Sequence, residues 1–331
     1  MRTVLIAGAA GFVGSHVADE ARRHGVGLVL MSHRRALPVP GPAAAAPEAG
    51  GGKPPGADPG TGPRHRVIAA DLTDPASLRG ACAGVDVLLH CASHIGSSPE
   101  RNESVNARGT KALVEEARRA GVGRIVYVST ASVYGRGTFR DAGPGRLTRR
   151  PASPTSRTRA AAEDTVLEAG GTVLRPHLVH GAGDIWVVPG LTRLLRALPG
   201  INPAWTSRTS LISVRDLARL VVGTGLAPAA GLTSSVHHAT HPEPVTAHTL
   251  LRTVASCAGL RRPDLELPLD RARSLVAADG PASAALDMLR TDHWFDGRPL
   301  WRDLRLDPGP GFAADFAASS AWYRRTLPVP G

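Results

Sequence analysis

Three glycines, spaced three residues apart, lie near the start of the chain between an apolar run and a helical pattern. Residues 3–7 (TVLIA) have the length and composition of a buried strand, and residues 12–24 carry apolar side chains at helical spacing. Gly8, Gly11 and Gly14 connect the two segments. Positions without a Cβ let the chain turn tightly and approach a pyrophosphate, and a helix N-terminus offers free N–H groups to phosphates. The segment therefore predicts a strand–loop–helix unit that binds a dinucleotide.

Strand and helix patterns then alternate over half of the chain. Strands are predicted at 28–31, 66–69, 86–90, 124–128 and 172–175, and helices at 75–82, 104–120 and 156–168. Such alternation predicts an α/β fold in which helices cover both faces of a parallel sheet. We expect a Rossmann-type, doubly wound sheet over residues 1–176. Residues 177–331, with helices at 214–226 and 246–258, are expected to form mainly a smaller substrate-binding lobe.

Two segments interrupt this pattern. Residues 37–63 contain 8 Pro and 7 Gly, which exclude a helix or central strand. They form either a solvated linker, the favoured interpretation, or a cover over part of the site. Residues 136–150 contain two short strand-like runs around the turn-rich segment 141–145, which predicts a hairpin flap over the substrate.

Composition excludes several classes of function. The formal charge is 39 − 28 = +11, but the basic residues are scattered and form no stripe with aromatic residues, so we expect no nucleic-acid partner. No apolar run approaches the ~20 residues of a membrane span. Cys82, Cys91 and Cys257 show no metal-ligand spacing and leave an odd thiol. These features predict a protein of the reducing cytoplasm without a bound metal.

The end of the second predicted strand indicates which dinucleotide binds. An acidic residue there selects NAD by accepting a hydrogen bond from the ribose 2′-hydroxyl, whereas this chain has Ser32. His33, Arg34 and Arg35 follow, and guanidinium groups match a phosphate. We therefore expect NADPH/NADP+ as the cofactor; the alternative is that the two arginines form only a solvated turn.

Further motifs follow in order along the chain, at 71–74 (DLTD), 90–93 (HCAS), 106–110 (NARGT), 129–135 (STASVYG), 175–181 (RPHLVHG), 211–217 (LISVRDL) and 238–246 (HATHPEPVT). Together with the glycine loop they resemble the extended short-chain dehydrogenases/reductases over nearly the whole length of the chain. The resemblance implies that Thr130 contacts the substrate carbonyl. With the glycine loop and the second strand, it implies the dinucleotide contacts Gly8, Gly11, Phe12, Val13, Gly14, Ser32, His33, Arg34, Arg35, Asp71, Leu72, Cys91, Ala92, Ser93, Asn106, Arg159 and Pro176.

The catalytic pair of that family is missing. The family places a Tyr and a Lys four residues apart on the helix after the strand that ends at 128, and this chain has Thr155 and Arg159 there. The spacing still places both on one helical face. A threonine hydroxyl is a poor acid, and arginine stays protonated under ordinary conditions. Tyr127, Tyr134 and Tyr323 have no Lys four residues later, so misalignment does not explain the loss.

Two classes of function remain open. In the first, the protein is an NADPH-dependent ketoreductase of a small-molecule ketone; Thr130, Arg159 and Thr155 are the candidate catalytic residues, and the proton comes from another source, such as the substrate. The candidate substrate-side residues are Ser93, His94, Ser132, His177, His180, Trp186 and Trp205. In the second, it is a non-catalytic NADP(H)-binding sensor or scaffold. A nucleotide-sugar epimerase or dehydratase is less favoured, because its chemistry begins with the missing Tyr.

The substitution and the Arg-, Ala- and Pro-rich composition together resemble an atypical group, the actinomycete ketoreductases of aromatic polyketides of the angucyclinone, simocyclinone type. This resemblance implies a role in antibiotic biosynthesis. The exact substrate, its stereochemistry, the source of the proton and the oligomeric state are left open by the sequence.

Overall fold

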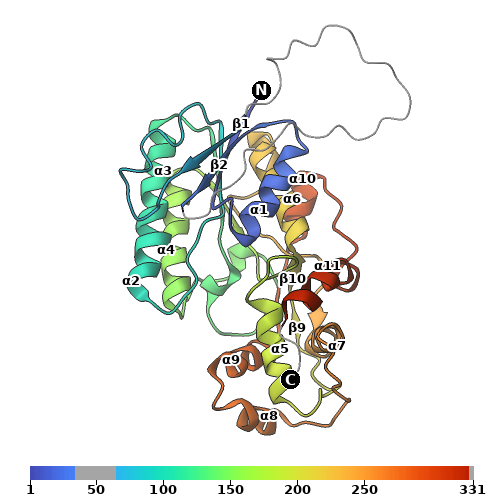
Figure 1. The fold of residues 1–331 in the computed structure, drawn as a ribbon. Helices are drawn as coiled ribbons and strands as arrows, with labels where there is room; N and C mark the ends of the chain where they lie inside the picture. Colours follow the sequence, from blue (N-terminus) through green and yellow to red (C-terminus); the bar gives the residue numbers. More distant parts are fainter. Residues whose placement is uncertain (34–64, 328–331) are drawn as a thin grey trace, which may run out of the picture.

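A seven-stranded parallel sheet forms the centre of the computed structural model, which describes residues 1–33 and 65–327 (Figure 1). Its spatial order is β11 (Val236–His238), β7 (Thr172–Arg175), β5 (Arg124–Val128), β4 (Val87–His90), β1 (Thr3–Ala7), β2 (Gly27–Ser32) and β3 (His65–Ala69). The strand order reverses direction between β1 and β4. In such sheets ligands bind outside the carboxyl ends of the strands at this reversal. The predicted doubly wound α/β fold is confirmed.

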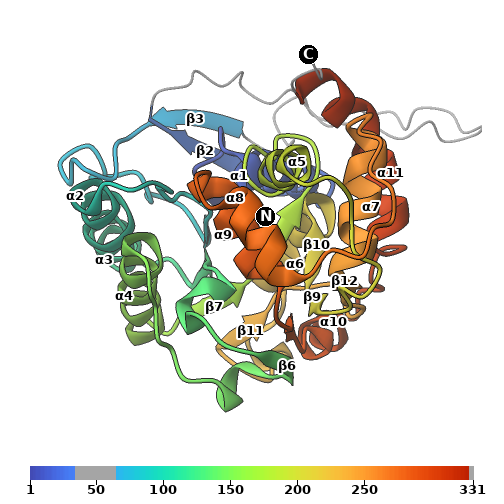
Figure 2. The same cartoon turned by 90° about the horizontal axis from the view of Figure 1, so that it is seen from below.

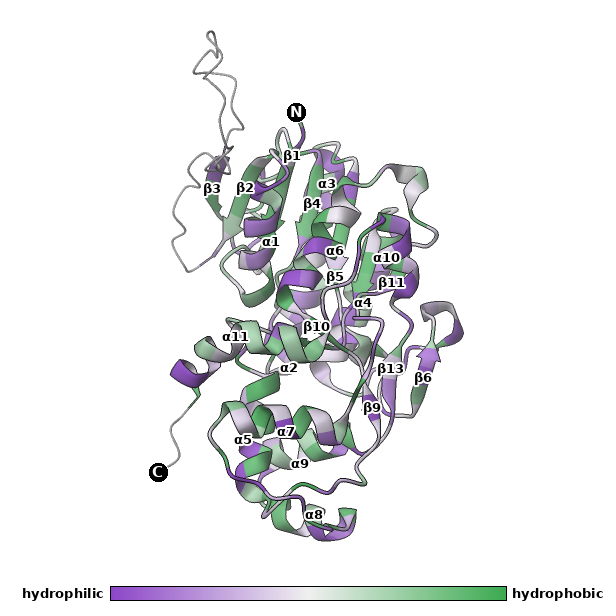
Figure 3. Ribbon diagram, turned by 90° about the vertical axis from the view of Figure 1, so that its right-hand side faces the viewer, coloured by the Kyte–Doolittle hydropathy of each residue, from purple (hydrophilic) through white to green (hydrophobic). Residues whose placement is uncertain are grey.

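Alternate residues of each central strand face two different helical layers. Val4 and Ile6 of β1 pack with α1 (Phe12–Arg22) and α6 (Val214–Leu226), and α10 (Arg298–Leu304) completes this layer. Leu5 and Ala7 instead pack with α3 (Gly109–Arg119) and α4 (Pro154–Glu168). The hydrophobic strands lie between these layers in Figure 3. Burial on both faces explains why these strands are continuous apolar runs.

The helix predicted at 75–82 is wrong. Residues 75–84 form consecutive turns that bury Leu78 and Cys82. Gly80 adopts φ +77°, which is incompatible with a right-handed helix. The predicted helix 104–120 is divided: the short α2 (Pro99–Asn102) leads into a π-helical turn (Glu103–Arg108) and then into α3.

The C-terminal half contributes both to the sheet and to a separate lobe (Figures 1 and 2). The lobe packs around an apolar cluster formed by α5 (Val187–Ala197), α7 (Ala247–Cys257), α8 (Leu269–Val276), α9 (Gly280–Leu289) and α11 (Phe312–Thr326). The pair β8 (Leu178–His180) and β10 (Leu211–Ser213) connects it to the core. Three C-terminal elements, α6, β11 and α10, return to the core, so residues 177–331 do not all belong to the lobe.

Residues 136–150 do not form the predicted hairpin. Their only regular elements are β6 (Phe139–Ala142) and a 3₁₀ turn (Pro144–Arg146). Strand β6 joins a four-stranded sheet in the order β12 (Val245–Thr246), β9 (Arg208–Thr209), β13 (His293–Phe295) and β6. Ion pairs from Arg140 to Asp292 (2.6 Å) and from Arg298 to Asp141 (2.7 Å) hold it there. Pairing with a strand about 150 residues later replaces the local pairing that the turn-rich sequence suggested.

The Pro/Gly-rich segment 37–63 lies outside the described residues. Within residues 1–33 and 65–327, no helix is long and apolar enough to cross a membrane.

Candidate active site

A cavity of about 1320 Å³ opens at the carboxyl ends of β1, β4 and β5, beside the segment that enters the lobe. It brings together most of the described residues that the sequence singled out, namely Gly8, Gly11, Phe12, Val13, Ser32, His33, Asp71, Leu72, Cys91, Ala92, Ser93, His94, Thr130, Arg159, Pro176, His177 and Trp186. Six others lie outside its lining: Gly14, Asn106, Ser132, Thr155, His180 and Trp205. Arg34 and Arg35 are not among the described residues.

The glycine loop leaves no room for side chains. Gly8 adopts φ +81°, and a Cβ there would lie 2.7 Å from the Ala92 Cα. A Cβ on Gly14 would lie 2.1 Å from the Gly8 carbonyl oxygen, so Gly14 packs the helix against the loop instead of lining the cavity. Helix α1 begins after Gly11 with no side-chain cap, which leaves its first N–H groups available to an anion. These residues fit the diphosphate of a dinucleotide.

Replacing Gly14 by alanine is therefore expected to weaken dinucleotide binding by about 100-fold, because the loop backbone must move to relieve the contact. Isothermal titration with NADPH and NADH measures this. Gly190→Ala in α5 is the matched control, since a Cβ there meets nothing within 4 Å. If the Gly14 variant binds both dinucleotides with unchanged affinity, the glycine loop is not their site.

The end of the cavity beside β2 and β3 is polar. The His33 Nε2 lies 3.1 Å from the Asp71 Oδ2, at the ends of β2 and β3. Arg101 and Arg108, from α2 and the following π-helical turn, also line the cavity and were missed by the sequence reasoning. Arg108 lies inside the NxxGT motif at 106–110 and Arg101 lies five residues before it, so this motif was the available signal. A Cβ on Gly109 would contact Leu72, so this turn packs closely on the loop that follows β3.

Asn106 acts from behind the cavity wall. It is buried; its Oδ1 accepts from the His94 backbone N–H (2.7 Å), and its Nδ2 donates to the His94 carbonyl (2.9 Å). It also donates to the Thr158 hydroxyl (3.2 Å). The amide thus holds the loop that carries His94.

Thr155 and Arg159, which stand where the family has its Tyr and Lys, contact different parts of the structure. Arg159 is 7% exposed, lines the cavity and donates through Nη2 to the Val128 carbonyl. The Thr155 hydroxyl instead donates to the Gly96 carbonyl (3.2 Å) and the Asn102 Oδ1 (3.1 Å), outside the cavity lining. The shared helical face keeps both on the same side of α4, but the short threonine side chain bonds to the neighbouring loop.

Thr130 lies at the end of β5 in extended backbone (φ −153°) and lines the cavity. Its hydroxyl donates to the Ser132 Oγ (3.0 Å) and accepts from the Ser132 N–H (3.1 Å). Ser132 is exposed and outside the lining, because the 3₁₀ turn 131–134 carries it away from the strand end. Thr130 is the N-cap of this turn, and its hydroxyl accepts from the Ser132 N–H.

The histidines predicted on the substrate side divide between cavity and lobe. His177 lines the cavity, and burial with the neighbouring His293 and His238 lowers its pKa to about 3. His180 instead packs against Phe312, with ring centroids 5.3 Å apart, and its pKa is lowered by burial to about 4. Trp205 packs on the apolar cluster of the lobe. Within the described part of the chain, no three metal-ligating side chains come together.

The cavity also contains apolar side chains that are unusually exposed. Trp186 is 54% exposed, and Ile185 and Ile95, which the sequence reasoning missed, are 67% and 44% exposed. Asp184 holds the loop that carries the first two: it accepts from the Val187 N–H (2.8 Å) and from the Tyr323 hydroxyl (3.0 Å). The loop is therefore anchored on its polar side and presents its apolar side chains to the cavity.

Stability is expected to fall as the pH decreases below about 6.5. Burial lowers the pKa of His90, His177 and His238 to about 3 and that of His180 to about 4. In the unfolded chain these imidazoles take up protons near pH 6.5, whereas the folded chain keeps them neutral, so the stabilisation is present above that pH and lost below it. Each of these histidines lowers the free energy of unfolding by about 1.4 kcal/mol for every pH unit that the pH falls between 6.5 and its folded pKa.

Denaturant unfolding at pH 7.5, 6.0 and 5.0 measures this loss. His180→Phe is the matched variant, because it removes one titrating group from an aromatic cluster; its slope against pH should be smaller by about 1.4 kcal/mol per unit. Identical slopes in the two proteins would contradict the assignment of His180.

Comparison with known proteins shows which family and which proteins this chain resembles. Residues 4–224 match the NAD dependent epimerase/dehydratase family. The chain is 29% identical over 271 residues to the 2-alkyl-3-oxoalkanoate reductase of Stenotrophomonas maltophilia strain K279a, covering 73% of this chain and 81% of that protein. It is also 29% identical over 217 residues to the 4-hydroxy-2-methyl-3-oxo-4-farnesyl-3,4-dihydroquinoline-1-oxide ketoreductase of Stigmatella aurantiaca, covering 62% and 64%.

Solved structures of other proteins have the same fold as this chain. MoeE5 in complex with UDP-glucuronic acid and NAD superposes with a TM-score of 0.70 at 25% identity, covering 99% of this chain and 100% of that one. The Bordetella bronchiseptica enzyme WbmH in complex with NAD+ shares the fold, with a TM-score of 0.70 at 20% identity and coverage of 98% and 99%. The family match spans more than half of the chain and includes the glycine loop, the Thr130 strand end and Arg159. This chain belongs to the NAD dependent epimerase/dehydratase family.

Proposed function

We propose that the protein is an NADPH-dependent ketoreductase that reduces a carbonyl of an apolar secondary metabolite, with an aromatic polyketide of the angucyclinone, simocyclinone type as the favoured substrate. It would act in antibiotic biosynthesis and would be located in the cytoplasm. One observation carries the proposal: Thr130 and Arg159 line the same cavity as the glycine loop, and exposed apolar side chains line it as well.

The charges around the cavity favour an apolar substrate over a nucleotide sugar. The arginines among its described lining residues are Arg101, Arg108 and Arg159, all from core elements. The lobe-side segment 176–187 contributes no Lys or Arg. A nucleotide sugar carries two phosphates that need cationic partners, whereas Trp186, Ile185 and Ile95 suit an apolar body. The names of the two reductases similar to this chain contain an alkyl and a farnesyl group.

The residues at the strand end can polarise a ketone. A bound NADPH would supply the hydride. The Thr130 hydroxyl would donate a hydrogen bond to the carbonyl oxygen, and the Arg159 guanidinium would stabilise the negative charge that develops there. His177 stays neutral at pH 7 because burial lowers its pKa to about 3, so it orients the substrate without adding charge.

The proton must come from elsewhere. Among the described residues that line the cavity there is no Tyr and no Lys, and burial raises the pKa of the Cys91 thiol to about 12. A phenol beside the ketone of an aromatic polyketide has the acidity of the missing tyrosine. We propose that this phenol donates the proton.

NADPH oxidation with a panel of ketones tests the function. The panel contains an aromatic polyketide ketone and a 2-alkyl-3-oxoalkanoate. UDP-glucose has no ketone and its epimerisation consumes no net NADPH, so it is incubated separately and its product is identified by chromatography. Turnover of an apolar ketone supports the proposal; binding of NADPH without turnover of any ketone supports the sensor, and conversion of UDP-glucose supports the epimerase. The same assay with NADH, repeated for Arg34→Ala, tests the cofactor preference: an equal loss with both cofactors contradicts a role in binding a 2′-phosphate.

A further inference from the structure

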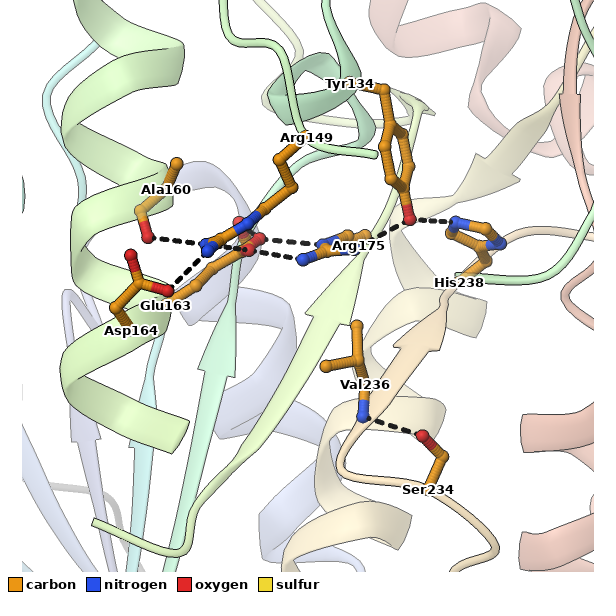
Figure 4. Close-up of polar contacts among 10 residues, drawn as sticks. Tyr134, Arg149, Ala160, Glu163, Asp164, Arg175, Ser234, Val236 and His238 are labelled. Atoms are coloured by element: carbon orange, nitrogen blue, oxygen red, sulfur yellow. Dashed lines mark hydrogen bonds and ion pairs between the residues drawn. The ribbon is translucent and has the colours of Figure 1, made fainter. Parts of the chain in front are cut away.

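A network of five buried polar side chains, joined at Glu163 by the partly exposed Arg149 (3.3 Å), lies directly behind the cavity (Figure 4). The Glu163 carboxylate accepts from the Ser129 hydroxyl and from Arg175 through Nε (2.9 Å) and Nη2 (2.5 Å). The Arg175 Nη1 donates to the Tyr134 oxygen (2.8 Å), which lies 2.7 Å from the His238 Nε2. The five side chains are between 0 and 4% exposed. The network therefore joins α4, the end of β5, β7 and β11 in the interior of the protein.

Three members of this network are close in sequence to residues of the cavity. Ser129 precedes Thr130, and Glu163 follows Arg159 by one helical turn. Arg175 precedes Pro176 and His177. Because the peptide chain and the helix transmit position over so short a distance, the bonds among Ser129, Glu163 and Arg175 determine how three cavity residues lie relative to one another.

The chemistry of the network excludes proton transfer along it. Arg175 separates Glu163 from Tyr134, and a guanidinium stays protonated in proteins. With Arg175 donating to the Tyr134 oxygen, the Tyr134 hydroxyl is left to donate to the His238 ring. The planar guanidinium instead makes two parallel bonds to the carboxylate and a third to the phenol, which is the geometry of a rigid connector.

We propose that the Glu163–Arg175 pair is the positioning unit of the active site: it holds Arg159, Thr130 and His177 in the arrangement that carbonyl reduction requires. The inference rests on the proposed ketone reduction. Glu163 and Arg175 lie outside the cavity lining, so they act through the residues next to them.

Three variants separate positioning from stability. Glu163→Gln leaves the buried Arg175 without its carboxylate, and Arg175→Met leaves Glu163 with only the partly exposed Arg149 (3.3 Å) as a cationic partner, so both are expected to lower the unfolding temperature. The double variant Glu163→Gln/Arg175→Met removes both charges and is expected to unfold at a higher temperature than either single variant. If the pair positions the site, kcat stays about 100-fold low in all three, while the KM for NADPH changes by less than about threefold.

The control is Asp216→Asn. Asp216 is also buried and paired with an arginine, Arg219 (2.7 Å), but neither residue lines the cavity. This variant should lose stability and keep its kcat. Recovery of kcat together with the unfolding temperature in the double variant would overturn the proposal, because the pair would then contribute only stability.

Hydrogen–deuterium exchange of the protein without ligand keeps this result separate from that of the proposed function. In the double variant, the amides of residues 128–131 and 177–178 should exchange faster than in the wild type, and they should be unchanged in Asp216→Asn. If the wild type reduces no ketone, the proposed function fails, but the exchange comparison still decides the positioning role. Unchanged exchange in the double variant would refute it.

Discussion

Replacing Arg159 by methionine is expected to lower kcat for ketone reduction by about 10²–10³-fold, the usual loss when one donor to a developing oxyanion is removed. Methionine keeps the length and apolar stem of the side chain, so the change removes mainly the charge and its donors. Thr155→Val should retain most of the activity, because the Thr155 hydroxyl bonds to the Gly96 carbonyl and to Asn102 outside the cavity. Single-turnover rates at saturating NADPH measure both.

Arg157→Met is the matched control for this change. Arg157 lies on the same helix, but it is exposed and bonds to the Ala152 carbonyl (3.0 Å). It should reduce the ketone at the wild-type rate. A Thr155 variant that loses all turnover while the fold and NADPH binding remain intact would contradict the proposed roles, as would an Arg159 variant with normal kcat.

Methylating the phenol next to the ketone of an aromatic polyketide is expected to lower kcat by about 10²–10⁴-fold, the usual contribution of a positioned acid. The ether keeps the shape and the apolar surface of the substrate, so its binding should change little. Rates with the phenol and its methyl ether, together with a dissociation constant for each, separate the chemical step from binding.

Two controls complete this comparison. A ketone without any neighbouring phenol should be as slow as the ether, and His177→Phe should retain turnover of the phenolic ketone. Reduction of the ether at the rate of the phenol would mean that a protein group donates the proton.

The fold could be predicted because each signal was local. The glycine loop and the alternating apolar runs describe contacts between neighbouring segments, and burial on both faces leaves continuous apolar strands such as β1 and β2. The helix at 75–82 was wrong because periodicity alone does not register that Gly80 adopts a left-handed conformation.

The candidate site was only partly predictable. The family motifs selected residues that line one cavity, including Thr130 and Arg159. They could not distinguish residues that line the cavity from residues that hold its wall in place. Asn106 and Thr155 have polar side chains at motif positions, and each is bonded to a loop backbone instead. Ile95 and Ile185 belong to no motif, and Arg108 occupies an unspecified position within the NxxGT motif; only the folded chain places them in the cavity.

By itself, the sequence determined the parallel sheet, the dinucleotide loop and the loss of the Tyr–Lys pair, since each depends on residue identity at short spacing. Only the tertiary structure decided that β6 pairs with β13 and that Glu163, Arg175 and His238 meet behind the site. These contacts join segments between 12 and about 150 residues apart. Their partners are chosen by packing of the whole domain, and a buried charge finds its counter-charge only after that packing has formed.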